Sequence, residues 1–288
     1  MDNPITRTAI LLLSCKDQKG LVFKITNFIY NVDGNIIDLD EHVDLNESMF
    51  FLRVAFVVQN ISITEEFLNS EFKELGEEFN ASWAINFESK KQKTAIFVSK
   101  YDHCLQDILW RNSQNEFNIE IKGVLSNHED LKYLADQNNI PFYHFEIKKE
   151  NKEKIEKDQL EILKKLNIDT IILARYMQIL SPHFVSKFPN KIINIHHSFL
   201  PAFAGGNPYK QAYNKGVKII GATSHYVTNE LDEGPIIEQD IIRISHNDSL
   251  KDLVRKGRDL ERLVLARAIL LHSQYKILVA GKKTIVFS

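Results

Sequence analysis

Short apolar runs separated by segments of helical spacing dominate the chain after residue 94, and they constrain the fold more than any other feature. Because the runs are continuously apolar rather than alternating, they are typical of strands that are buried on both faces of a sheet. Strands that alternate with helices predict an α/β domain with a Rossmann-like, mostly parallel sheet covered by helices on both sides. The five runs lie at residues 94–99, 119–126, 141–147, 170–174 and 191–196.

The first part of the chain predicts a different domain. Its pattern indicates the order strand, helix, strand, strand, helix, strand, at residues 8–14, 20–31, 36–43, 49–57, 64–79 and 82–87. This βαββαβ order is that of a ferredoxin-like unit. Residues 88–93, with the sequence ESKKQK, are charged and contain no apolar side chain, as expected of a linker between two cores. We therefore expect a first domain at residues 1–87 and a second at residues 94–288.

Composition limits the partners of such a protein. With 36 Lys and Arg against 38 Asp and Glu, the net charge of -2 gives no broad attraction to nucleic acid or to an anionic membrane, so a small-molecule partner is expected. Cys15 and Cys104 are too few and too far apart for a disulfide framework or a Cys-x-x-Cys metal site. The N-terminal sequence has no basic region followed by a long apolar run, and this predicts a cytoplasmic protein.

Two motifs carry polar side chains suited to carbonyl chemistry. Asn194 and His196 stand two residues apart where the strand 191–196 ends, so both side chains point to one face and can donate hydrogen bonds to one carbonyl oxygen. Asp232 follows in the turn-like sequence Leu-Asp-Glu-Gly-Pro, where a carboxylate near His196 would favour the imidazolium and relay protons through a water. An Asp that only shapes its own turn is the alternative interpretation.

The histidines also suggest a zinc hydrolase, since His196, His197, His225 and Asp232 would be enough ligands for zinc. However, the H-E-x-x-H spacing of a zincin helix is absent from the sequence, and His196 and His197 would diverge as neighbours on a strand. The sequence also lacks Gly-rich nucleotide-binding loops of the forms G-x-G-x-x-G and G-K-[ST]. We therefore expect neither a metal nor a cofactor.

A family resemblance adds to the interpretation of the first domain. Residues 15–44, CKDQKGLVFKITNFIYNVDGNIIDLDEHVD, resemble the first half of an ACT domain, a small βαββαβ module that usually binds amino acids. The resemblance implies that Asp17, Gly20 and Asn35 bind an amino-acid effector, and that the protein forms a homo-oligomer. Turn and capping chemistry alone is the alternative explanation for a Gly and an Asn at these positions.

A second resemblance covers residues 93–288. The segments RYMQILSP (175–182), NIHHSFLPAF (194–203) and GATSHYVTNELDEGPIIEQD (221–240) together resemble the folate-dependent formyltransferase family. The resemblance implies that Asn194, His196 and Asp232 form a catalytic trio. It also implies a folate pocket lined by Met177, Gln178, Ile179 and Leu180, supported by His225, and we expect Gly205 and Gly206 to form a rim near the formyl group.

Departures from the transferase pattern indicate the reaction. Residues 99–105, SKYDHCL, lack the Gly-rich loop that would hold the phosphate of a glycinamide ribonucleotide acceptor, and His197 stands where the transferases commonly have Pro. An ACT domain ahead of a formyltransferase domain resembles the formyltetrahydrofolate deformylases, in which water replaces the amine acceptor.

The resemblance to these deformylases implies hydrolysis of 10-formyltetrahydrofolate, with water, to formate and tetrahydrofolate. Such a reaction supplies formate for purine synthesis and balances the one-carbon folate pools. Two alternatives stay open. The first is a formyltransferase that uses an amine acceptor such as glycinamide ribonucleotide, and the second is a catalytically silent amino-acid sensor that kept the folate pocket.

Overall fold

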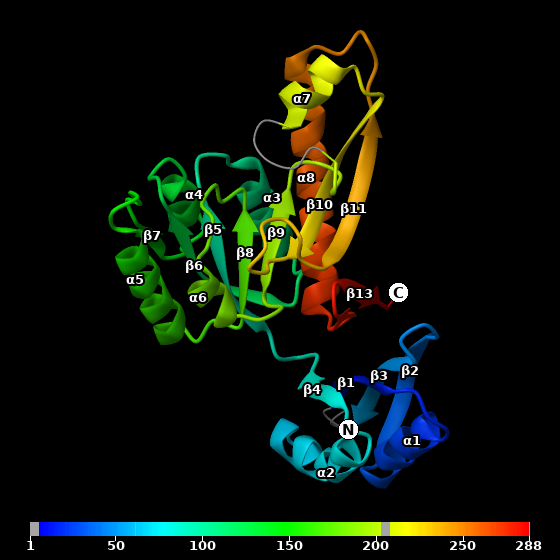
Figure 1. Ribbon diagram of the computed structural model, residues 1–288. Coiled ribbons are helices and arrows are strands. Elements are labelled where there is room, and N and C mark those ends of the chain that lie inside the picture. The colour runs from blue at the N-terminus through cyan, green and yellow to red at the C-terminus, as the bar shows by residue number, and fades with distance from the viewer. Residues whose placement is uncertain (1–5, 61, 203–207, 288) are drawn as a thin grey trace. The chain divides into compact units, whose positions relative to one another are not determined.

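The computed structural model of the protein describes residues 6–60, 62–202 and 208–287 (Figure 1). The chain divides into two compact units, and the change of unit between Lys91 and Gln92 falls inside the expected linker. None of the helices in the described ranges is long and apolar enough to cross a membrane.

The unit boundaries differ from the expected domains at the C-terminus. The first unit comprises Met1–Lys91 together with Gln274–Ala280 and Ile285–Ser288, whereas the second comprises Gln92–Ser273 and Gly281–Thr284. Most of the last two strands, which the sequence placed in a second domain of 94–288, therefore group with the first unit.

The first unit has the βαββαβ order expected from the sequence. The elements are β1 (Arg7–Lys16), α1 (Leu21–Asn31), β2 (Gly34–Asp44), β3 (Met49–Val58), α2 (Glu65–Glu78) and β4 (Ser82–Phe87). The strands form an antiparallel sheet in the order β2-β3-β1-β4. Gly20, with φ of 94°, precedes α1, and Thr64 caps α2 by accepting a hydrogen bond from the Phe67 amide at 3.1 Å.

Both faces of β1 are buried along residues 9–13, and this explains why its central run, AILLL, is apolar at every position. Leu11 and Leu13 belong to the core that α1 and α2 cover. Leu12 points to the other face, where it packs with Phe51 and with Phe287 near the end of the chain. This second cover is the hairpin of β12 (Ile277–Ala280) and β13 (Lys283–Val286). The burial of the second face of β1 accounts for the grouping of the hairpin with the first unit.

The second unit is built on a seven-stranded sheet in the order β11-β10-β9-β8-β5-β6-β7. All five runs predicted as strands form parallel strands, although the run 141–147 contributes only three residues. The expected α/β architecture with a mostly parallel sheet is therefore confirmed. The strands are β5 (Gln92–Val98), β6 (Ile119–Ser126), β7 (Phe142–His144), β8 (Thr170–Ala174), β9 (Ile192–His196), β10 (Ile219–Tyr226) and β11 (Ile236–Arg243).

Two antiparallel strands extend the parallel part. β10 is antiparallel to β9. β11 is antiparallel to β10, because the connection between them returns the chain directly beside itself. Figure 1 shows α8, the longest helix, running along β10 and β11. The helices are α3 (His103–Ser113), α4 (Lys132–Gln137), α5 (Lys152–Lys165), α6 (Pro182–Ser186), α7 (Pro208–Lys215) and α8 (Leu250–Ser273).

Candidate active site

Strand pairing brings the two sequence motifs together. β9 lies between β8 and β10, and in its register with β10 Asn194 stands opposite His225 while His196 stands opposite Thr223. The Asn194 Nδ2 atom lies 3.2 Å from His225 Nε2. The carboxyl end of β9 is the edge of the sheet where ligands of α/β proteins bind, so these side chains are placed for a ligand.

The loop after β10 brings Asp232 to the same place. Gly234 permits this, because a β-carbon on that residue would lie 1.7 Å from the Tyr226 carbonyl oxygen. The Tyr226 amide in turn donates a hydrogen bond to the Pro235 carbonyl oxygen at 2.9 Å. Asp232 has φ of 57°, in the left-handed region that Asp tolerates better than most residues. The loop thus folds back on the end of β10, with the Asp232 side chain beside His196.

Asp232 lies between two histidines. Its Oδ2 atom is 3.2 Å from His196 Nδ1, and its Oδ1 atom is 3.7 Å from His225 Nε2. Burial is the largest single influence on Asp232 and would raise its pKa, but the hydrogen bond from His196 and the other interactions with His196 and His225 together outweigh it and hold the pKa below its usual range. Asp232 is therefore an ionised acceptor at neutral pH.

The histidine nitrogens have different partners. His225 Nδ1 lies 2.9 Å from the Tyr226 carbonyl oxygen, which only accepts, so we assign the proton to Nδ1 and let Nε2 accept from the Asn194 amide. The Asn194 amide has a second N–H for a ligand. His196 Nε2 is buried and has no hydrogen-bond partner among the described residues. Because buried ring nitrogens are normally paired, this atom marks where a bound group would complete the site.

These side chains line a cavity of about 500 Å³, which we call the reaction cavity. The cavity brings together nearly all the residues that the sequence singled out in the second domain, namely Asn194, His196, Asp232, His225 and the segment Met177, Gln178, Ile179 and Leu180. Gly205 and Gly206, expected to form a rim, lie outside the described residues.

The segment after β8 forms an apolar wall of the reaction cavity. Its position is fixed by the Met177 amide, which donates a hydrogen bond to Ser99 Oγ at 3.0 Å. The side chains of Met177 and Ile179 are exposed by 54% and 60%, while Leu180 is buried. Apolar side chains that face a cavity and are open to solvent are suited to cover a flat aromatic ring.

Several residues of the reaction cavity were given no role from the sequence, among them Tyr101, Arg175, Tyr176 and residues 227–231. A signal for two of them existed. Arg175 directly follows β8, and Tyr101 follows β5 closely, so both lie at the ligand-binding edge of the sheet. Burial and the nearby charge of Arg175 lower the pKa of His197 to about 3, so its ring is neutral at neutral pH.

The expected effector residues lie on the surface of the first unit. Asp17 and Gly20 belong to the turn between β1 and α1, where the Asp17 amide donates to the Ser48 carbonyl oxygen at 2.9 Å. Asn35 is near the start of β2, opposite Val57 of β3. All three are exposed, and their role in binding an effector stays a prediction.

Possible metal ligands gather at a different place from the one considered in the sequence. His103, Cys104 and Glu261 have ligand atoms within 4.8 Å of one another. The Glu261 carboxylate already faces Arg175, whose Nε atom is 3.4 Å away, and accepts a hydrogen bond from Tyr209. Burial raises the pKa of Cys104 well above its usual range, and this favours a neutral thiol. The group therefore has the character of an internal ion pair rather than of a metal site.

Comparison with known proteins places this site in a family. Residues 92–269 match the model of the formyl transferase family, and the chain belongs to that family. A formyltetrahydrofolate deformylase of Synechocystis is 53% identical over 98% of this chain and 99% of its own length. The crystal structure of a formyltetrahydrofolate deformylase from Pseudomonas syringae has a TM-score of 0.96 and 40% identity, covering 98% of this chain and 95% of that one. Within the formyl transferases, the chain therefore belongs to the formyltetrahydrofolate deformylases.

The likeness to transferases is more limited. A glycinamide ribonucleotide transformylase from Symbiobacterium toebii has a TM-score of 0.65 and 27% identity, covering 70% of this chain and 97% of that one.

Proposed function

We propose that the protein hydrolyses 10-formyltetrahydrofolate to formate and tetrahydrofolate. The observation that carries the proposal is the convergence of Asn194, His196 and ionised Asp232 on one cavity, in a chain whose full-length relatives bear the name of this activity. The formate would supply purine synthesis, and the reaction would balance the pools of one-carbon folates.

The geometry supports a role for each side chain. The oxygen of a water attacks the formyl carbon, and the carbonyl oxygen gains negative charge that the free N–H of Asn194 and a protonated His196 Nε2 stabilise. Asp232 accepts a hydrogen bond from the attacking water and passes the proton towards N10. The bond between the formyl carbon and N10 then breaks, and N10 leaves with that proton. His225 acts through Asn194, whose amide it orients.

An assay without an acceptor tests the proposal. Purified protein is incubated with 10-formyltetrahydrofolate in buffer alone, and formate and tetrahydrofolate are measured over time. We expect the two products to form in equal amounts over many turnovers. Folate binding without turnover would instead indicate a silent sensor and contradict the proposal.

A second candidate function is formyl transfer to an amine, and the similarity to glycinamide ribonucleotide transformylases favours it. The same assay separates the two functions. Turnover that begins only when glycinamide ribonucleotide is added would support transfer, whereas formate release that does not need the amine supports hydrolysis.

We further propose that the first unit is an ACT domain that binds an amino acid through Asp17, Gly20 and Asn35. The observed βαββαβ order and sheet support this assignment. Glycine and methionine are the amino acids to test, because one-carbon folates feed the metabolism of both. Calorimetry on the full chain should give a binding heat that Asn35→Ala removes. Absence of heat with every amino acid would leave the unit as an assembly module.

Self-association through the first unit is a separate proposal. The edge strands of its sheet are β2 and β4 in the described residues, and open edges can pair with another copy. Ile37 on β2 is 55% exposed, so Ile37→Lys should favour the monomer in sedimentation experiments if β2 forms the contact. Monomeric wild-type protein would contradict self-association altogether.

A further inference from the structure

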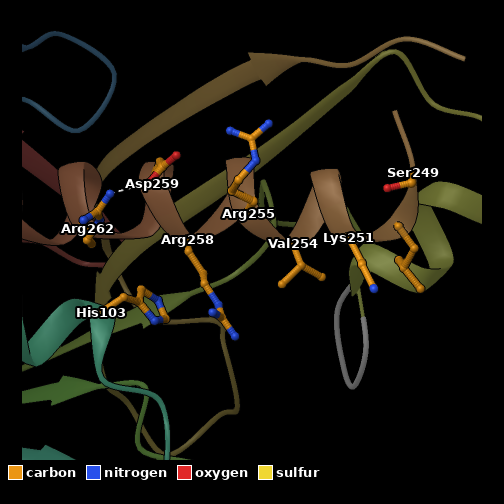
Figure 2. A pocket seen from close by; sticks show the side chains of 9 residues that line it. His103, Ser249, Lys251, Val254, Arg255, Arg258, Asp259 and Arg262 are labelled. Carbon is orange, nitrogen blue, oxygen red and sulfur yellow. Dashed lines mark hydrogen bonds and ion pairs between the residues drawn. The ribbon is translucent and has the colours of Figure 1, made fainter. Parts of the chain in front are cut away.

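The second unit contains another hollow next to the reaction cavity. This hollow, which we call the α8 cleft, has a volume of about 770 Å³ and lies along α8. Figure 2 shows His103 and Arg258 towards one end of the cleft, with Lys251 and Ser249 towards the other. Four of its nine lining residues are Lys or Arg and one is Asp259, which pairs with Arg262, so the lining keeps a net positive charge that attracts anions. The lining residues are His103, Ser249, Leu250, Lys251, Val254, Arg255, Arg258, Asp259 and Arg262.

The aromatic ring of Tyr101 lies between residues of the two hollows. Tyr101 lines the reaction cavity together with Arg175, whose guanidinium carbon is 5.0 Å from the centre of the ring. The guanidinium carbon of Arg258, from the α8 cleft, is 5.6 Å from the same centre. Each contact is a cation–π interaction, so the two arginines hold the ring at the boundary.

A buried ion cluster adjoins this ring. Glu261, only 1% exposed, accepts a hydrogen bond from His103 Nε2 at 2.8 Å and another from the Tyr209 hydroxyl, and it pairs with Arg175. His103 lines the α8 cleft and Arg175 lines the reaction cavity, so the cluster connects their walls. Removing one partner from such a buried pair is costly, so the cluster holds His103 and Arg175 in fixed positions beside the Tyr101 ring.

Close packing fixes the cluster from the α8 side. A β-carbon on Gly257 would lie 2.2 Å from the Tyr209 ring, so the helix approaches this ring as closely as a glycine allows. On its other side the Tyr209 ring is 5.9 Å from the ring of His197, which lines the reaction cavity. The Tyr209 ring is therefore packed between α8 and the ring of His197, and it holds the Glu261 cluster in place.

We infer that the Tyr101 ring, backed by the Glu261 cluster, closes the reaction cavity against amines that approach from the α8 cleft, and that Tyr101 determines the specificity for water. The inference rests on the proposed hydrolysis and explains how a formyl transferase fold restricts itself to water. Removal of the ring would open a passage between a cationic cleft and the formyl carbon. The amine best suited to that path carries a phosphate, because the cleft offers cations at its walls.

The reaction through the opened passage is formyl transfer. The amine nitrogen attacks the formyl carbon, the bond from that carbon to N10 breaks, and the proton lost by the amine is taken up by N10. The products are tetrahydrofolate and the N-formyl amine, and no other reactant is needed.

The test measures how the formyl group divides between water and an amine. Wild type, Tyr101→Ala, Tyr101→Leu and Tyr101→Phe are each given 10-formyltetrahydrofolate with glycinamide ribonucleotide or with glycinamide, and formate and N-formyl product are separated and counted. The ratio of N-formyl product to formate does not depend on the total rate. Tyr133→Ala, at an exposed tyrosine of α4, is the matched control.

Wild type, Tyr101→Phe and Tyr133→Ala should give formate alone. For Tyr101→Ala, the ratio of N-formyl product to formate should be at least about ten times the smallest ratio that the assay can detect in wild type, as expected when a size barrier is lost. The ratio for Tyr101→Leu should lie between those of wild type and Tyr101→Ala. The increase should be larger for the ribonucleotide, whose phosphate the cleft attracts.

Two results would overturn the inference while leaving the proposed function intact. One is a ratio for Tyr101→Ala and Tyr101→Leu equal to that of wild type, and the other is loss of all turnover in both, which would assign Tyr101 to hydrolysis itself. Failure of wild type to release formate without an amine would instead refute the proposed function.

Discussion

The Nδ1 atom of His196 lies 3.2 Å from Asp232 Oδ2, and Nε2 of the same ring is buried without a hydrogen-bond partner among the described residues. The histidine thus turns one nitrogen to a carboxylate and leaves the other for a ligand in the reaction cavity. A carboxylate in this position fixes the orientation of the ring and stabilises positive charge on it.

Asp232→Asn should lower the turnover number for formate release by about 10²–10³, the size of effect seen when an electrostatic contact to the transition state is lost. The amide keeps the shape of the side chain, so the affinity for tetrahydrofolate should change little. Steady-state formate release and a fluorescence titration with tetrahydrofolate measure the two quantities. Equal losses of folate affinity and turnover would show that Asp232 only shapes the pocket.

Asn194→Ala should also reduce the turnover number by about 10²–10³, because one donor to the developing oxyanion is removed. The protein should keep its folded state, since the Asn194 side chain is only partly buried. Circular dichroism and formate release provide the comparison. His183→Ala, at a histidine on α6 outside the reaction cavity, should retain wild-type turnover, and near wild-type turnover of Asn194→Ala would refute the oxyanion role.

Local sequence patterns predicted the parallel strands and the convergence of the catalytic motifs. Each apolar run predicts a buried strand without reference to the rest of the chain. In a parallel sheet the carboxyl ends of the strands lie at the same edge, where ligands bind. This rule places Asn194 and His196 at the ligand-binding edge of the sheet, whereas the resemblance to the formyltransferase family implied that Asp232 joins them. The structure adds the antiparallel strand β10, which aligns His225 with Asn194.

Features that depend on distant contacts could not be predicted in the same way. Leu12 and its neighbours indicate a strand buried on both faces, but nothing local identifies a C-terminal hairpin as the second cover. Glu261 lies beside Leu260 in an amphipathic helix, where a charged residue normally faces water. Its burial requires partners from three separate parts of the chain, including Arg175 and Tyr209. The helical spacing of apolar residues does not predict contacts between such distant residues.

Gly234→Ala should displace the loop that carries Asp232. The added β-carbon would overlap the Tyr226 carbonyl oxygen at 1.7 Å, so the loop must move away from the end of β10. We expect a loss of about 1–3 kcal/mol in the free energy of unfolding, as for other overpacked sites, together with a large fall in turnover. Chemical denaturation and formate release measure the two effects.

Gly216→Ala is the control for Gly234→Ala. Gly216 has φ of 64°, but a β-carbon there would meet no atom within 4 Å. It should therefore cost about 1 kcal/mol through backbone strain alone and leave the turnover number unchanged. Normal turnover in Gly234→Ala would mean that the position of Asp232 does not depend on this close approach.

His272 should make the second unit less stable in mild acid. Burial lowers the pKa of His272 from 6.5 to about 4. Its Nδ1 atom is 2.8 Å from the Tyr226 hydroxyl, and its Nε2 atom is 3.0 Å from Thr170 Oγ1. Thr170 donates its own proton to Gln92, so it accepts from Nε2, and Nδ1 is left to accept from Tyr226. The neutral ring is therefore fully paired, and a second proton would break the Tyr226 bond.

The sign of the pH effect follows from the lowered pKa of His272. Between pH 6.5 and 4 the unfolded chain binds a proton that the folded state does not, so stability falls as the pH falls, by up to about 3 kcal/mol in all. Denaturation can be followed by Trp110 fluorescence in a Trp83→Phe background, because these are the two tryptophans of the chain. His272→Gln can make both hydrogen bonds without titrating and should flatten this dependence. The same slope in both proteins would show that another group controls the acid sensitivity of the second unit.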